Sequence, residues 1–187
     1  IDNESMNKEI IMKIGIIGSG VVGETLANGF LKHGYEVTRG SRDPEKLKGW
    51  QSETGANIAD FNETAQWADL VVLAVKGTAA VDALKLIQDE SLKNKTVLDA
   101  TNPIADEAPV NGVLKFFTGP NESLMERLQE AKPEANFVKG FSSVGNAQMV
   151  NPEYTEGRPS MFICGDEDNA KKQVSQILDQ FGWETDD

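Results

Sequence analysis

The sequence predicts an α/β fold of the Rossmann type, a doubly wound and mainly parallel sheet with helices on both faces. Short apolar runs alternate with helical patterns along the chain, and this alternation is typical of parallel sheets. The run at residues 70–75 is continuously apolar, as expected for a strand that is buried on both faces. A glycine-rich turn joins the first apolar run to the first helical pattern. We therefore expect one NAD(P)-binding domain over residues 1–187.

The first βαβ unit, residues 13–42, carries the turn that predicts a dinucleotide site. An apolar run at 14–17 precedes the turn, a helical pattern follows it, and a second strand begins at Tyr35. The first glycine permits the tight turn, the second lets a pyrophosphate approach the backbone, and the third lets the helix pack closely. Free N–H groups at the helix start attract phosphates. The alternative is a glycine turn that binds nothing. The turn comprises Gly18, Ser19, Gly20, Val21, Val22 and Gly23.

The end of the second strand favours NADP over NAD. An NAD site usually has an acidic residue here that accepts the ribose 2′-hydroxyl. This chain has Ser41 and Arg42 instead, with Lys46 four residues further on. A guanidinium attracts a 2′-phosphate and can pair with it in a bidentate way, and the serine offers a hydroxyl donor. The alternative is that these cations are ordinary surface charges, and the neighbouring Asp43 is a counter-argument.

The remaining elements follow in alternation. Strands are expected at residues 56–59, 70–75, 96–100, 136–139 and 160–164, with a last strand from Trp183. Helices are expected at 44–53, from 60 or 62 to 67, at 78–87, at 123–132, and from 166 or 168 to 181. Candidate residues for the helix starts are Asp43, Asp60 or Asn62, Thr78, and Asp166 or Asp168, and Gly55 is expected to end the second helix.

Residues 105–119 interrupt this pattern with proline and glycine. A loop of this length is uncommon unless it is functional or mobile. It is expected to form a lid or a partner surface, or else a plain surface loop with Phe116 and Phe117 buried.

In an open parallel sheet the ligand lies beyond the carboxyl ends of the strands. The glycine turn and the Ser41 loop would hold the adenosine half of the cofactor. Two further loops should lie along the nicotinamide half, and a fifth, residues 141–146, borders the same crevice. Lys76 is the cation near the redox end, and Asn102 is a neutral donor and acceptor. The two further loops comprise Ala74, Val75 and Lys76, and Thr101, Asn102 and Pro103.

Few other side chains suggest catalysis, and no catalytic residue is identified. His33 is expected to cap the first helix at its carboxyl end, Cys164 to lie in the core, and Asp99 to be an ordinary polar strand end. No Ser–His–acid, Cys–His or paired-carboxylate arrangement is plausible. Hydride transfer between two bound carriers depends more on proximity and orientation than on side-chain chemistry.

Composition narrows the class of protein. A net charge of −12 argues against nucleic acid and anionic membranes as partners. One cysteine and one histidine argue against a disulfide framework and a metal cluster. The chain contains neither a membrane-spanning run nor a signal-peptide pattern, so we expect a cytoplasmic protein. Residues 1–11 are expected to be disordered or derived from cloning, with Met6 or Met12 as the natural start.

Several motifs together resemble the NADPH-dependent oxidoreductases that act with the deazaflavin coenzyme F420. The resemblance spans about residues 13–183. It implies that Ser41, Arg42 and Lys46 bind the 2′-phosphate, that residues 19–22 lie near the pyrophosphate, and that hydride passes directly between nicotinamide and deazaflavin. The motifs lie at residues 13–20, 40–46, 73–76, 99–103, 139–145 and 162–166.

The chain departs from that family in two respects. Family members usually continue into a helical segment that contributes to a homodimer and to the second-substrate pocket, and no such segment is expected within residues 1–187. Val75-Lys76 is closer to what pyrroline-5-carboxylate reductases show. We predict an NADP(H)-dependent oxidoreductase with a small redox substrate, a deazaflavin or a flavin. The alternatives are an imine reductase of the pyrroline-carboxylate type and a non-catalytic NADPH-binding sensor or adaptor.

Overall fold

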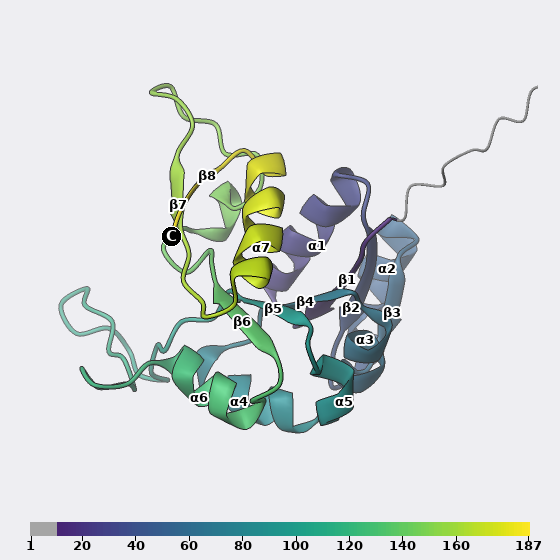
Figure 1. Cartoon of the computed structure of the whole chain (residues 1–187), viewed down its shortest axis with the longest axis horizontal. Coiled ribbons are helices and arrows are strands. Elements are labelled where there is room, and N and C mark those ends of the chain that lie inside the picture. Colours follow the sequence, from purple (N-terminus) through teal and green to yellow (C-terminus); the bar gives the residue numbers. More distant parts are fainter. Residues whose placement is uncertain (1–10) are drawn as a thin grey trace, which may run out of the picture.

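The computed structural model describes residues 11–187, so the expectation for the first residues lies almost entirely outside the described residues. The main sheet has six parallel strands in the order β3-β2-β1-β4-β5-β6 (Figure 1). The predicted Rossmann-type sheet is therefore confirmed. Its strands are β1 (Lys13–Ile17), β2 (Glu36–Gly40), β3 (Asn57–Ala59), β4 (Leu70–Leu73), β5 (Thr96–Asp99) and β6 (Asn136–Lys139).

Helices cover both faces of this sheet (Figure 1). Phe30 of α1 and Val174 of α7 are fully buried in one apolar core, and Leu84 of α4 and Leu128 of α6 are fully buried in the other. Burial of such side chains stabilises each layer by about 1.5–3 kcal/mol per residue. The helices are α1 (Val21–Lys32), α2 (Lys48–Thr54), α3 (Phe61–Trp67), α4 (Gly77–Lys85), α5 (Asp89–Leu92), α6 (Leu124–Ala131) and α7 (Asp168–Gln180). None of these helices has the length and apolar character needed to cross a membrane.

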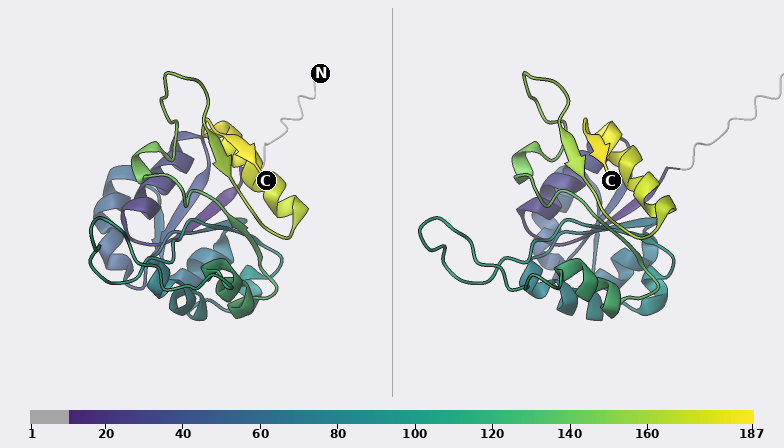
Figure 2. Two further views of the ribbon diagram at one scale, coloured as in Figure 1. Left: turned by 90° about the vertical axis from the view of Figure 1, so that its left-hand side faces the viewer. Right: turned by 60° about the vertical axis from the view of Figure 1, so that its left-hand side comes forward.

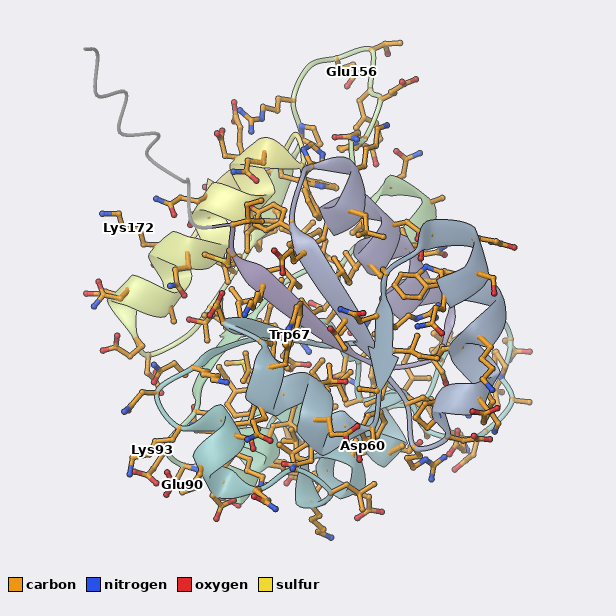
Figure 3. The ribbon with its side chains drawn as sticks, turned by 90° about the vertical axis from the view of Figure 1, so that its right-hand side faces the viewer. Asp60, Trp67, Glu90, Lys93, Glu156 and Lys172 are labelled. Carbon is orange, nitrogen blue, oxygen red and sulfur yellow. The ribbon has the colours of Figure 1, made fainter. Side chains whose placement is uncertain are left out.

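The helix ends show which predicted caps form. Asp60 accepts from the backbone N–H of Glu63 at 2.8 Å and begins α3 with a reciprocal capping box. Figure 3 labels Asp60 and Trp67 at the two ends of this helix. Asn62, the other candidate, instead accepts from the N–H of Gln88. Gly55 ends α2 in the left-handed conformation, as predicted.

One predicted helix is divided, and two predicted helix starts differ from the structure. The helix expected over 44–53 divides into a 3₁₀ turn, Pro44–Leu47, and α2. Thr78 does not cap α4, because the helix begins at Gly77 and the N-cap position is occupied by Lys76. Neither Asp166 nor Asp168 caps α7, whose first flanking residue is Glu167 and has no side-chain bond to the helix.

The carboxyl-terminal part forms a second, two-stranded sheet. Strand β7 (Ser160–Phe162) pairs in parallel with β8 (Glu184–Asp186). Met161 and Ile163 are buried, whereas Phe162 and Cys164 are exposed. The prediction that Cys164 belongs to the core is therefore wrong. Buried and exposed side chains alternate from Met161 to Cys164, two residues beyond the end of β7, and the cysteine falls at an exposed position.

Residues 104–118, which we call the arm, form an irregular hairpin that projects from the body (Figure 2, right). The N–H of Ala105 donates to the carbonyl of Lys115 at 2.9 Å, and the N–H of Phe117 donates to that of Pro103 at 2.9 Å. Phe116 is 57% exposed, so the alternative with both phenylalanines buried is wrong. Phe117 is partly buried, against the core on the α4 and α6 side.

Candidate dinucleotide-binding site

The chain changes direction across the sheet between β1 and β4. These strands are neighbours, with Ile17 beside Leu73, but β1 leads through α1 to β2 on one side and β4 leads through α4 to β5 on the other. Loops that leave two such strands separate and leave a crevice at their carboxyl ends. Two adjoining cavities lie there, and Gly20, Ala74, Val75, Lys76 and Asp106 line both of them.

The glycine turn has the geometry that the motif predicts. Gly18 has a φ of +147°, and a Cβ there would lie 2.3 Å from the carbonyl oxygen of Ala74. A Cβ at Gly23 would lie 2.6 Å from the carbonyl oxygen of Gly18. Neither position accepts a side chain. Gly20 is different, because nothing lies within 4 Å of its missing Cβ and the residue borders both cavities. The open space at Gly20 fits the close approach of a ligand to the backbone.

The start of α1 is open to an anion. Gly20 flanks the first turn in an extended conformation, and no side chain caps the helix. Ser19, Gly20 and Val21 are exposed. The first N–H groups of a helix have no partner within the helix and carry a partial positive charge. These observations fit the pyrophosphate of a dinucleotide.

The larger cavity, about 920 Å³, lies beside the end of β2. Ser41 is 4% exposed, and its Oγ accepts from the N–H of Asp43 at 3.1 Å. Arg42 and Lys46 are exposed and form no ion pair with any other described residue. The structure thus brings Ser41, Arg42 and Lys46 to one cavity. Asp43 and Asp82 border it as well.

The second cavity, about 630 Å³, lies between the glycine turn, the end of β4 and the arm. Its walls are mainly apolar, with Lys76, Thr101, Asn102, Asp106 and Glu107 as the polar members. The apolar lining residues are Val21, Val22, Ala74, Val75, Ala100, Ile104 and Ala105. Pro103 is half-buried at the base of the arm and is not part of this lining.

A buried polar network supports the loop at Asn102. Asp99 is fully buried, and one carboxylate oxygen accepts from the N–H of Thr101 at 2.9 Å and from its hydroxyl at 2.6 Å. The other oxygen lies 3.0 Å from Nζ of Lys139, which also donates to the carbonyl of Thr101. The Asn102 amide donates to the carbonyl of Ser142 at 2.9 Å. Asp99 therefore holds the loop in place through these bonds, and the expectation that it is an ordinary polar strand end is wrong. The sequence signal that could have indicated this pair is an acid, Asp99, and a lysine, Lys139, near the ends of two successive predicted strands.

Lys76 is held by the arm. Its Nζ pairs with the carboxylate of Asp106, to which the hydroxyl of Thr78 also donates at 3.0 Å. The hydrogen bond from Lys76, and after it the one from Thr78, holds the pKa of Asp106 below its ordinary value. Sequence reasoning expected Lys76 to be a cation at the redox end but missed the carboxylate that neutralises it.

Arg39 is a further residue that sequence reasoning missed. It is 1% exposed, lies in β2 and donates to two carbonyls of the glycine turn. His33, by contrast, follows the prediction and ends α1. Its Nε2 lies 2.9 Å from Oδ1 of Asn151, and its ring packs against Phe181.

The strand order and the crevice together define a Rossmann-type dinucleotide-binding protein. Residues 13–103 match the model of the family described as NADP oxidoreductase, coenzyme F420-dependent. A solved structure from Arthrobacter sp. FB24, provisionally assigned as an F420-dependent NADP reductase, is 31% identical with a TM-score of 0.86. That comparison covers 93% of this chain and 83% of the other. The chain belongs to this family of NADP oxidoreductases.

Two further comparisons extend over most of this chain, one with a solved structure and one with a curated protein. A hypothetical protein from Sinorhizobium meliloti is 26% identical with a TM-score of 0.80, over 95% of this chain and 84% of the other. The metalloreductase STEAP3 of Rattus norvegicus is 26% identical over 171 residues, 91% of this chain and 32% of that protein. The chain spans less than half the length of the curated relatives it matches.

Proposed function

We propose that the protein is an NADP(H)-dependent oxidoreductase that exchanges a hydride between nicotinamide and a second small redox substrate, a deazaflavin or a flavin. One observation carries the proposal. Two cavities meet at the glycine turn, one bordered by unpaired cations and the other by apolar side chains. An anionic nucleotide end and a flat, weakly polar redox end need these two environments.

The larger cavity would take the adenosine end. Arg42 and Lys46 are free to pair with a 2′-phosphate, and such charge-assisted bonds are stronger than neutral ones. The Oγ of Ser41 accepts from the N–H of Asp43, so its own proton remains available to the phosphate. Ser19, with the unpaired N–H groups at the start of α1, would hold the pyrophosphate.

The apolar cavity would take the nicotinamide and the second substrate. Bound NADPH supplies the hydride donor, and the part of the chain is to bind, orient and exclude water. Ala74 and Val75 offer an apolar wall, and Thr101 and Asn102 offer polar atoms on a loop that Asp99 holds in place. The lining contains no histidine, cysteine or tyrosine, and its one lysine, Lys76, is paired with Asp106. That lining suits a redox partner that needs little side-chain chemistry.

The test is a titration of the protein with NADPH and NADH, followed by the fluorescence of its three tryptophans. We expect NADPH to bind much more tightly than NADH. Turnover is then measured with a deazaflavin, a flavin and a cyclic imine. Oxidation of NADPH with the imine alone would favour the imine reductase alternative. Tight binding without turnover on any acceptor would favour a sensor or adaptor.

A further inference from the structure

Arg39 lies under the glycine turn and not in the cavities. Its guanidinium uses all three of its nitrogens. Nε donates to the carbonyl of Gly18 at 3.3 Å, one terminal nitrogen donates to the carbonyl of Gly20 at 2.9 Å, and the other donates to Glu24 at 3.0 Å. The side chain is 1% exposed, which is unusual for a charged group and requires full pairing.

These contacts decide where the turn directs its donors. In a trans peptide the C=O and the following N–H point to opposite sides, and the described residues contain no cis peptide. With the carbonyls of Gly18 and Gly20 turned toward Arg39, the N–H groups of Ser19 and Val21 point away from it. Both residues are exposed. Ser19 borders the cavity beside Ser41, and Val21 borders the cavity beside Asn102.

Arg39 also neutralises an acid at an unfavourable place. Glu24 lies in the first turn of α1, the turn that would face the pyrophosphate, and its side chain is 53% exposed. An unpaired carboxylate there would repel a phosphate. The guanidinium also stacks over the ring of Trp50 at 5.4 Å, and Trp50 donates to Asn28 of α1 at 2.8 Å. The arginine therefore ties β2, the turn, α1 and α2 together.

We infer that Arg39 is a positioning residue for cofactor binding. It holds the N–H groups of the glycine turn toward the pyrophosphate and neutralises Glu24 beside them. The inference rests on the proposed function. According to this inference, Arg39 supports the binding affinity that is common to NADPH and NADH. The preference for NADPH over NADH comes from the exposed cations beside Ser41.

The test compares three ligands on Arg39→Lys. A lysine keeps the charge but cannot reach three acceptors at once. NADPH and NADH contain the pyrophosphate, whereas 2′-AMP has only the 2′-phosphate. We expect Arg39→Lys to weaken NADPH and NADH by about tenfold each, the scale of a lost bond to a charged donor, and to leave 2′-AMP within about twofold. Equal weakening of 2′-AMP and NADPH, or unchanged NADPH affinity, would overturn the inference.

Lys132 offers a matched control. It is another buried cation, 7% exposed, bonded to the carbonyl of Ile87 and to Asp89, and it lines neither cavity. Lys132→Met should leave all three affinities unchanged. A loss of NADPH affinity in this variant equal to that in Arg39→Lys would show a general effect of losing a buried cation and would overturn the inference. Failure of the unaltered protein to bind NADPH would instead overturn the proposed function, and this inference with it.

The role of Glu24 is tested by rescue. The variant Arg39→Met leaves the Glu24 carboxylate unpaired near the phosphates. The double variant Arg39→Met, Glu24→Gln removes that carboxylate's charge and should therefore bind NADPH more tightly than Arg39→Met alone. Added salt should reduce the difference between these two variants, because the repulsion is screened. A double variant that binds no better than the single one would overturn the electrostatic part of the inference. A purely structural role for Arg39 predicts no such rescue.

Discussion

The cavity beside Ser41 and the cavity beside Asn102 share the glycine turn, but their walls are held in different ways. In the first, the loop that carries Ser41 and Arg42 is fixed locally, by a bond from the N–H of Asp43 to the Oγ of Ser41. The second depends on pairs 30 and 40 positions apart, Lys76 with Asp106 and Lys139 with Asp99. Arg42 and Lys46 border only the first cavity and are free for a ligand, whereas Lys76, which borders both cavities, is already paired. The loop with the exposed cations is thus held by contacts close in sequence, whereas the loops at Lys76 and Asn102 are held by long-range ion pairs.

The largest expected effect concerns the pair that supports the second cavity. Lys139→Met leaves the fully buried carboxylate of Asp99 without its cation, and breaking a buried pair from one side costs about 3–5 kcal/mol. Denaturant unfolding should show this loss in the free energy of unfolding. Lys85→Met is the control, because its pair with Asp82 is exposed, and it should change stability by less than about 1 kcal/mol. Similar values for both variants would mean that the network does not support the loop.

The next effect separates the two cofactors at the first cavity. Arg42→Ala should weaken NADPH by about 1.5–3 kcal/mol, the scale of a bond to a charged group, and leave NADH nearly unchanged. The measurement is a fluorescence titration with each cofactor. Lys48→Ala removes a nearby cation that pairs with Glu45 and lines neither cavity, so it should affect neither cofactor. Equal losses for both cofactors in Arg42→Ala would remove the basis for the NADP assignment.

The glycine turn that both cavities share gives a smaller, paired prediction. Gly20→Ala places a methyl group in open space, so the free energy of unfolding should change by about 0.5 kcal/mol or less. Both dinucleotides should bind about 1–2 kcal/mol more weakly, because the methyl group occupies space that the ligand needs. Gly18→Ala should, unlike Gly20→Ala, lower the free energy of unfolding, because its Cβ would clash with the Ala74 carbonyl. A stable Gly20→Ala that binds NADPH normally would contradict the proposed place of the pyrophosphate.

The smallest effect is the pH dependence of the arm. Because Lys76 and Thr78 lower the pKa of Asp106 in the folded state, their contribution is present above the ordinary aspartate pKa of about 3.9. It is lost as the pH falls through the lowered folded value. Asp106→Asn should therefore speed hydrogen exchange in residues 104–118 at pH 7, and the difference from the unaltered protein should vanish in acid. A difference that persists in acid would exclude the ion pair as the cause.

The first half of the chain shows how far prediction from sequence reaches. The glycine turn, the helix after it, the capping residue Asp60 and the left-handed Gly55 all follow from local rules and are present as expected. The continuous apolar run at β4 predicts a strand buried on both faces, and β4 lies in the middle of the sheet. Prediction was weaker where a side chain's environment depends on a distant segment. The local pattern alone predicts a buried Cys164, a helix cap at Thr78 and, in one alternative, a buried Phe116. In the structure Cys164 and Phe116 are exposed, and Thr78 lies inside the first turn of α4.

The order of elements, the parallel sheet and the glycine turn can be predicted from the amino-acid sequence alone. These depend on backbone preferences and on apolar periods that act over a few residues. Three features emerge only when the chain is folded: Arg39 is buried beneath the turn, Lys139 faces Asp99, and Asp106 pairs with Lys76. The register of β5 and β6 places Lys139 beside Asp99, and the path of the arm brings Asp106 to Lys76. A charge has no preferred partner until the fold supplies one.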